Sequence, residues 1–195
     1  MEIKPYLEAL KDPKPQARID AVAALSGAGE AASGPLSGMA IDQNLPAHAR
    51  ACAVKALGGI GGPGAAKTLI LALGDPDVVV KIPAAMALGK MKAEGAAGAL
   101  AGLLGDESTL VRKYAADAIC DIVQSCATAE KLLSLKGAIT QGMPSSKAAS
   151  EAASSVLAAI SAKGQSLMSS DSNGLGSLSI SAHKGGAGPK MQKIH

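Results

Sequence analysis

The chain has 195 residues and a formal net charge of +3, and 48% of its residues are hydrophobic, with no Phe, no Trp and only two Tyr. This length accommodates one domain and a tail. The small net charge does not indicate nucleic-acid binding, the N-terminus lacks a signal-peptide pattern, and no apolar run reaches the ~18 residues that span a membrane. We therefore expect a cytoplasmic, all-α protein whose core is built from Ala, Leu, Ile, Val and Met.

An alanine-rich segment recurs along the chain, and its copies agree residue by residue. The copies are residues 12–25, 44–57, 75–88 and 106–119, with a weaker fifth at 144–157, and their starts lie 32, 31, 31 and 38 residues apart. The seventh residue is basic in the first four copies, namely Arg18, Arg50, Lys81 and Arg112, and is Ser150 in the fifth. This agreement in register indicates an internal repeat.

Shorter apolar segments lie between these copies, and each is long enough for two or three helical turns. They are residues 5–10, 34–41, 65–73, 95–104 and 130–139. Gly and Pro stand at the joints, where Gly caps a helix end and Asp or Ser precedes a helix start. The sequence predicts five antiparallel helix pairs in a repeat domain of residues 1–162.

The composition changes at Lys163, where Ser and Gly become frequent and helical periodicity is lost. We expect residues 163–195 to form a flexible tail. Residues 178–182 alternate apolar and polar side chains, as a strand added to a partner's sheet would, but a disordered tail is favoured. The tail is long enough to fold back onto the repeats, where Leu175, Leu178 and Ile180 could fill an apolar patch.

The repeat resembles the HEAT-like repeats named after phycobilisome lyase subunits, whose outline is D-x-x-x-x-V-R-x-x-A-A-x-A-L-x-x-[IL]-G. Two copies carry this outline best, through Asp75, Val80, Lys81, Ala84, Ala85, Ala87 and Leu88 and through Asp106, Val111, Arg112, Ala115, Ala116, Ala118 and Ile119. The resemblance covers about the first 160 residues. It implies a right-handed α-solenoid with the second helix of each pair on the inner face, and it leaves the function open.

Motifs that carry chemistry are weak in this sequence. Residues 59–64 match G-x-G-x-x-G in letters, but a helix precedes them and Pro63 interrupts the turn, which favours a linker over a dinucleotide site. Cys52 follows His48 by four residues, so the two share a helical face, a spacing that is common by accident. The remaining His and Cys residues have no ligand spacing. We expect no catalytic residue, no cofactor and no metal.

The basic residues of the repeat predict a structural ladder rather than a ligand site. Arg18, Arg50, Lys81 and Arg112 occupy equivalent positions on neighbouring helices, roughly 10 Å apart. Aspartates at the turns, above all Asp75 and Asp106, lie near enough in the repeat to pair with them. Nucleic-acid binding would need more basic surface and stacking aromatic residues, so we do not expect it.

The eighth, ninth and twelfth residues of each copy should face the groove. Most are mixed in character, but the third copy is wholly apolar there, with Ile82, Pro83 and Met86, and the fourth contributes Lys113 and Tyr114. An apolar patch on a solvent-facing surface is typical of an interaction site. Two explanations stay open: a partner covers the patch, or the tail or the curvature of the repeats does. Pro83 should also kink its helix or delay its start.

These observations predict a non-enzymatic scaffold that binds a peptide or helix of another protein in the concave groove of the solenoid. The resemblance implies an alternative, a bilin lyase or lyase-like chaperone subunit that handles a tetrapyrrole-bearing protein. The absence of Phe and Trp to sandwich a flat chromophore argues against it.

Overall fold

A computed structural model of the chain describes residues 2–175, with side chains described for residues 2–169, and every regular element in this range is helical. The α-helices are α1 (Lys4–Ala9), α2 (Pro15–Gly27), α3 (Glu30–Ile41), α4 (Ala47–Ile60), α5 (Gly62–Ala72), α6 (Val78–Lys90), α7 (Ala97–Gly102), α8 (Thr109–Ser125), α9 (Ala129–Gly142) and α10 (Lys147–Leu175). Short 3-10 helices, Glu94–Ala96 and Leu103–Gly105, flank α7. None of the described helices is long and apolar enough to cross a membrane.

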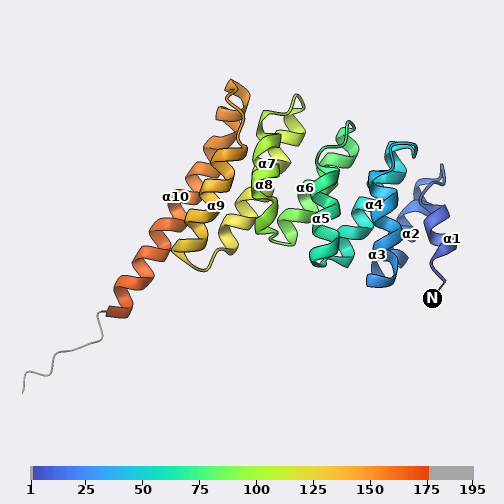
Figure 1. The fold of residues 1–195 in the computed structure, drawn as a ribbon, viewed down its shortest axis with the longest axis horizontal. Helices are drawn as coiled ribbons and strands as arrows, with labels where there is room; N and C mark the ends of the chain where they lie inside the picture. Colours follow the sequence, from blue (N-terminus) through green and yellow to red (C-terminus); the bar gives the residue numbers. More distant parts are fainter. Residues whose placement is uncertain (1, 176–195) are drawn as a thin grey trace, which may run out of the picture.

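The helices form hairpins that stack in one direction along the molecule (Figure 1). Each even-numbered helix packs against the odd-numbered helix before it and against the next even-numbered helix, so that α2, α4, α6, α8 and α10 make one continuous row. The odd-numbered helices form the second row, in which α3 packs against α5 and α7 packs against α9. The prediction of an all-α solenoid of five helix pairs is therefore confirmed.

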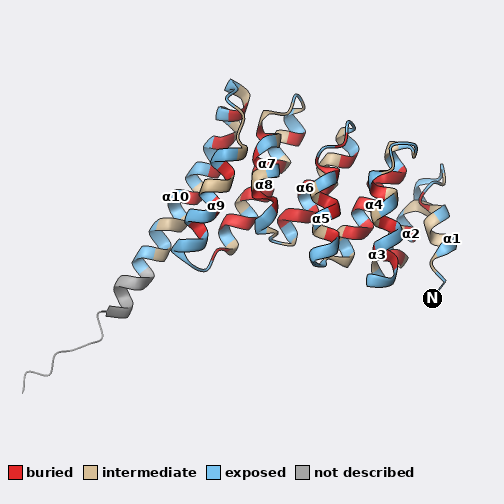
Figure 2. Ribbon diagram, in the orientation of Figure 1, coloured by how far each residue is buried: buried red, intermediate tan, exposed pale blue. Residues whose placement is uncertain are grey.

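The core lies between the two rows and consists almost entirely of Ala and Leu with a few Ile and Val (Figure 2). It is one cluster that extends from Leu10 in the first repeat to Ile160 in the last. Helix α4 has eight buried residues, whereas α1 has none, because α1 covers the first repeat on one side only. Small alanine side chains let the helices approach closely without aromatic residues to fill the space.

Each even-numbered helix begins three residues after the start of its sequence copy, at residues 15, 47, 78, 109 and 147. The turn before the helix is closed by an aspartate whose Oδ1 accepts a hydrogen bond from the backbone N–H two residues later. This holds for Asp12, Asp75 and Asp106 at 2.7–2.8 Å. Before α4 the aspartate is Asp42, which lies two residues ahead of the second copy and accepts from the N–H of Asn44 at 2.9 Å. The second turn is therefore two residues longer than the others.

Two glycines let neighbouring even-numbered helices approach each other closely. A Cβ added at Gly58 of α4 would lie 2.7 Å from the Cβ of Ala87 in α6. A Cβ added at Gly89 of α6 would lie 2.8 Å from the Cα of Ala118 in α8. Each glycine directly follows the last residue of its copy. Close packing at these two glycines thus sets the distance between neighbouring repeats.

Pro83 does not delay the start of its helix, because α6 begins at Val78 and continues through Pro83 to Lys90. The first turn is already closed before Pro83: the N–H groups of Val80 and Lys81 donate to the carbonyl of Asp77 at 3.0 and 3.2 Å. Buried Val80 and Ala84 then hold the helix on the core on either side of the proline. The predicted late start is wrong.

The last helix also extends further than predicted, since α10 continues past Lys163 to Leu175. The Nζ of Lys163 donates to the carbonyl of Gln124 at 3.0 Å, and Leu167 packs against the core. Packing on α8 and α9 therefore continues the helix where Ser and Gly obscure the helical pattern. Helix α10 thus crosses the predicted boundary at residue 163, while the division into a repeat domain and a tail stays a prediction. Leu178 and Ile180 of the predicted tail contacts lie outside the described residues.

Candidate functional site

The exposed side of the even-numbered row carries three adjoining hollows, which together we call the inner groove. The α2–α4 pocket has a volume of about 510 Å³, the α4–α6 hollow about 420 Å³ and the α6–α8 hollow about 160 Å³. Lys55 lines the first two, and Met86 and Lys90 line the last two. The shared residues make the hollows one continuous surface across four helices.

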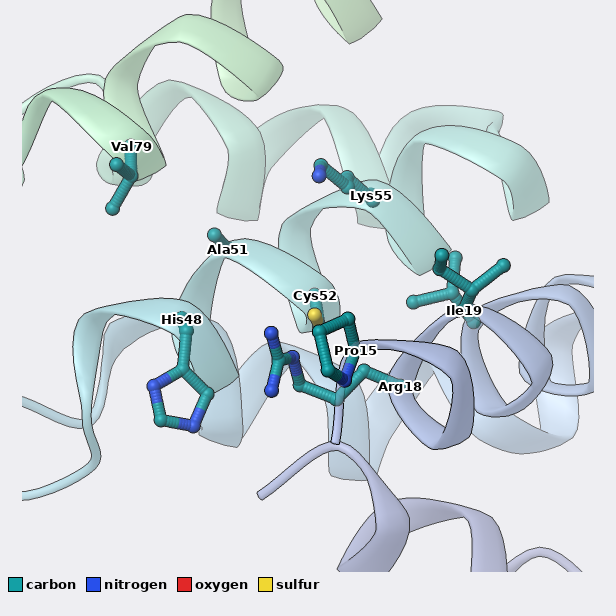
Figure 3. Close-up of a pocket in the computed structure, with 9 residues that line it drawn as sticks. Pro15, Arg18, Ile19, His48, Ala51, Cys52, Lys55 and Val79 are labelled. Atoms are coloured by element: carbon teal, nitrogen blue, oxygen red, sulfur yellow. The ribbon is translucent and has the colours of Figure 1, made fainter. Parts of the chain in front are cut away.

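The α2–α4 pocket is the largest of the three, and its walls are mostly apolar (Figure 3). It is lined by Pro15, Arg18, Ile19, Val22, His48, Ala51, Cys52, Lys55 and Val79. Ile19 and Val79 are more than half exposed although both are large and hydrophobic. Cations from α2 and α4, Arg18 and Lys55, stand among these apolar side chains.

His48 and Cys52, the pair singled out by its spacing, do line this pocket together (Figure 3). His48 is exposed, and Cys52 is buried. The sequence did not reveal the pocket around them, because Ile19 and Val79 come from the copies before and after. The signal that could have found it is the fifth residue of each copy, occupied by His48 and Val79.

The predicted groove residues divide into two groups. Pro83 and Met86 line the α4–α6 hollow, and Met86 and Tyr114 line the α6–α8 hollow. Ile82 is half-buried and Lys113 is exposed, but neither is among the residues that line these hollows. Each precedes a lining residue by one position, which turns it about 100° around the helix axis.

The predicted ladder has its strongest rung between α4 and the turn before α6. Arg50 donates from Nε to Asp75 Oδ2 at 2.8 Å and from Nη2 to Asp75 Oδ1 at 2.9 Å, and it also reaches Asp77 at 2.8 Å. Arg50 and Asp75 are 4% and 3% exposed. The hydrogen bond to Asp75 raises the pKa of Arg50. Burial alone would raise the pKa of Asp75, but hydrogen bonds from Arg50, the Asp77 N–H and Gln43 outweigh it and lower that pKa.

A second rung joins Lys81 of α6 to Asp106 in the turn before α8, with an Nζ–Oδ2 distance of 2.7 Å. Burial opposes the ionised form of Asp106, yet the hydrogen bonds from Lys81 and the Ser108 N–H lower its pKa. Both rungs therefore tie one repeat to the next through an ionised aspartate.

Arg18 and Arg112 form no such rung within residues 2–175. Arg18 donates to the carbonyls of Asp12 and Pro13, and Arg112 to those of Asp106 and Glu107, each in its own turn. The longer second turn follows Arg18, and after Arg112 the turn before α10 has Ser146 as its capping side chain, which accepts from the Ala149 N–H. Neither arginine therefore has an equivalent aspartate opposite it.

The three cysteines are free thiols in the structure. Burial raises the pKa of Cys120, and the carboxylates of Asp117 and Asp121 raise it further. Burial likewise raises the pKa of Cys126. A raised pKa leaves less thiolate, so both side chains are poor nucleophiles at neutral pH.

Stacked helical hairpins, a repeat of about thirty residues and an open inner groove define an α-solenoid repeat protein. The model of the HEAT-repeat family matches residues 39–120 and 66–141, together more than half of the chain. The protein therefore belongs to the HEAT-repeat family. A search of curated proteins found no match.

Solved structures with the same fold include natural and designed repeat proteins. The complex of CpcE and CpcF of phycocyanin lyase from Nostoc sp. PCC7120 has 22% identity and a TM-score of 0.58, over 83% of this chain and 96% of that one. A designed armadillo repeat protein in complex with the peptide (KR)4 has 21% identity and a TM-score of 0.54, over 93% and 94% of the two chains. At these identities the similarity shows the fold.

Proposed function

We propose that this protein is a non-enzymatic interaction scaffold that holds a peptide or helix of a partner protein in the inner groove. The observation that carries the proposal is the continuity of the three hollows across α2, α4, α6 and α8. Membership of the HEAT-repeat family supports it, because solenoids present extended concave surfaces to their partners. The designed armadillo protein bound to a peptide supports it as well.

Apolar side chains on the groove supply anchor points for such a partner. Ile19 is 60% exposed, Val79 56% and Met86 39%, although each would gain free energy by burial. Met side chains adapt to varied partner shapes, and Tyr114 combines an apolar ring with a polar hydroxyl. Together they form the apolar centre that binding surfaces usually contain.

The proposal is tested by selecting displayed 12-residue peptides on the protein and measuring their affinity by fluorescence anisotropy. Met86→Lys places a charge in two of the hollows, and we expect it to weaken selected peptides by about tenfold or more. Leu71→Lys is the matched control, since Leu71 of α5 is 64% exposed and lies on the odd-numbered row. Failure to select any peptide, or equal loss with both variants, would contradict the proposal.

A second candidate is a bilin lyase or lyase-like chaperone subunit. It is supported by the similarity to the phycocyanin lyase complex over nearly all of that chain, and by the α2–α4 pocket with His48 and Cys52. Mixing the protein with free bilin tests it by visible absorbance. A saturable band shift that is lost in Cys52→Ser would favour the lyase, and an unchanged spectrum would remove it.

A further inference from the structure

The charges along the inner groove change sign from one end to the other. The α2–α4 pocket and the α4–α6 hollow are lined by the cations Arg18, Lys55 and Lys90 and by no carboxylate. The α6–α8 hollow is lined by the carboxylates Asp117 and Asp121 of α8, beside Lys90. The groove is therefore basic over its first two hollows and predominantly acidic in the third.

Four of these five charges have no polar contact within the described chain and are available to a partner, whereas Arg18 donates to carbonyls of its own turn. Within residues 2–169, the side chains of Lys55, Lys90, Asp117 and Asp121 form no hydrogen bond or ion pair. By contrast, Arg50 is neutralised inside the ladder by Asp75 and Asp77. A ligand can thus meet the groove charges without breaking an existing contact.

Two further charges stand on the same helices and have to be weighed. Asp20 of α2 is exposed and accepts a hydrogen bond from Gln16 at 2.8 Å, and it is not among the residues that line the α2–α4 pocket. Lys113 of α8 lies one turn before Asp117 and outside the α6–α8 hollow. Asp20 and Lys113 each reduce the electrostatic potential at their end of the groove. The residues that line the hollows still make the first end basic and the other end acidic.

We propose, on the basis of the proposed function, that the groove binds an extended peptide in a single direction. An acidic residue of the peptide, next to an apolar one, lies at the α2–α4 pocket opposite Lys55, and a basic residue lies at the α6–α8 hollow opposite Asp117 and Asp121. Complementary charges of this kind mainly fix orientation and register, because like charges meet when the peptide is reversed. The apolar wall formed by Ile19 and Val79 accommodates the neighbour of the acidic residue.

The helix row also sets the spacing of the two charged residues. Packed helices lie about 8–10 Å apart, so the first and third hollows are separated by about 16–20 Å. An extended chain advances about 3.3 Å per residue, which places the acidic and basic residues about five or six positions apart. A helix rises only about 1.5 Å per residue and would need about twice as many positions.

The test uses the full chain and a displayed library of random 12-residue peptides. We expect the enriched peptides to carry one acidic and one basic residue about five or six positions apart, always in the same order. Their affinity should fall when the ionic strength is raised, since exposed charge pairs are screened by salt. Enriched peptides without a charge pair, or with both orders equally frequent, would overturn the inference while leaving the proposed function intact; a library with no enriched peptide would overturn both.

Reversing the charge of Lys55 tests whether it contacts the acidic residue of the peptide. Lys55→Glu should weaken a selected peptide about tenfold, and the same peptide with its acidic residue changed to Lys should regain affinity for that variant. Lys67→Glu, an equal change at an exposed position of α5, is the matched control and should have no effect. Asp121→Lys provides the same test at the other end. Equal weakening by Lys67→Glu, or no rescue by the changed peptide, would contradict the assignment.

Discussion

The Arg50–Asp75 pair is the most buried charged contact in the described part of the chain, and its polar atoms are well satisfied. Asp75 accepts from Arg50, from Gln43 and from the N–H of Asp77. Buried ion pairs contribute little net stability by themselves, but removing one partner leaves the other charge buried and unpaired. We infer that the pair fixes the register between the second and third repeats.

Replacing Asp75 and, separately, Asp12 distinguishes the contribution of the ion pair from that of the turn hydrogen bond. Asp75→Ala loses the contacts with Arg50 and Gln43 as well as the turn bond. We expect it to lower the free energy of unfolding by about 3 kcal/mol, because Arg50 keeps only Asp77 and the Leu45 carbonyl. Asp12→Ala loses the equivalent turn bond alone and should cost about 1 kcal/mol. Urea unfolding measures both, and equal losses would show that the ion pair is dispensable.

The lowered pKa values of Asp75 and Asp106 predict loss of stability in acid. In the unfolded chain the pKa of an Asp is about 3.9, which is above the pKa of these two groups in the folded protein. Between the folded and the unfolded pKa values, the unfolded chain therefore binds more protons than the folded one. The stability that the two ionised aspartates contribute is present above about pH 5 and is lost as the pH falls through the folded pKa values. Unfolding free energies at pH 6, 4 and 3 should fall less steeply for Asp75→Asn than for the wild type. Parallel curves would contradict this origin of the acid sensitivity.

The sequence could locate the basic and acidic residues of the ladder but could not pair all of them. Equivalent positions follow from the repeat, and Lys81–Asp106 and Arg50–Asp75 formed as the pattern indicates. Arg18 and Arg112 did not, because pairing also depends on the length and composition of the next turn. The turn after Arg18 has extra residues between Asp42 and Ala47, and the turn after Arg112 has Ser146 where an aspartate would be needed. Whether an arginine finds a partner in such a turn depends on how the turn folds, which the repeat pattern does not specify.

At the scale of helices, close packing across the even-numbered row depends on glycine. Gly89→Ala brings a Cβ to 2.8 Å from the Cα of Ala118, so α6 and α8 have to move apart. Overpacking costs about 1–3 kcal/mol, against a gain of about 1 kcal/mol in helix propensity, and we expect a net loss of about 1 kcal/mol. Gly38→Ala in α3 has nothing within 4 Å and should gain about 0.5–1 kcal/mol. Thermal unfolding of the two variants should shift in opposite directions; a shift in the same direction would contradict the packing argument.

Helix starts were more predictable than helix ends. Asp-led turns are local signals, and α2, α6 and α8 each begin three residues after such an aspartate. The end of α10 depends on contacts with Gln124 and on core packing by Leu167, both supplied by other helices. Pro83 likewise fits inside α6 because buried residues on both sides outweigh its local cost.

At the scale of the whole molecule, the groove was predictable only in its central part. Met86, Pro83 and Tyr114 depart from the repeat and could be found by comparing copies. The α2–α4 pocket was missed, because most of its walls are ordinary residues of three copies, such as Ile19 and Cys52, and only the fifth residue of two copies points to it. Such a pocket is defined by the distance and curvature between repeats, which depend on all the helix contacts together.

The row of repeats also predicts how stability is distributed along the chain. In a solenoid each repeat contacts only its neighbours, so the central repeats gain from two interfaces and the terminal ones from one. Helix α1 has no buried residue, whereas α4 has eight and α8 seven. Amide hydrogen exchange followed by mass spectrometry should therefore be fastest in α1 and slowest in α4, α6 and α8.

In Gly89→Ala the loss of protection should concentrate in α6 and α8, which lose their close contact, while α2 and α3 keep theirs. Uniform exchange along the chain, or an equal loss of protection in every helix of the variant, would show that the molecule opens as one cooperative unit instead.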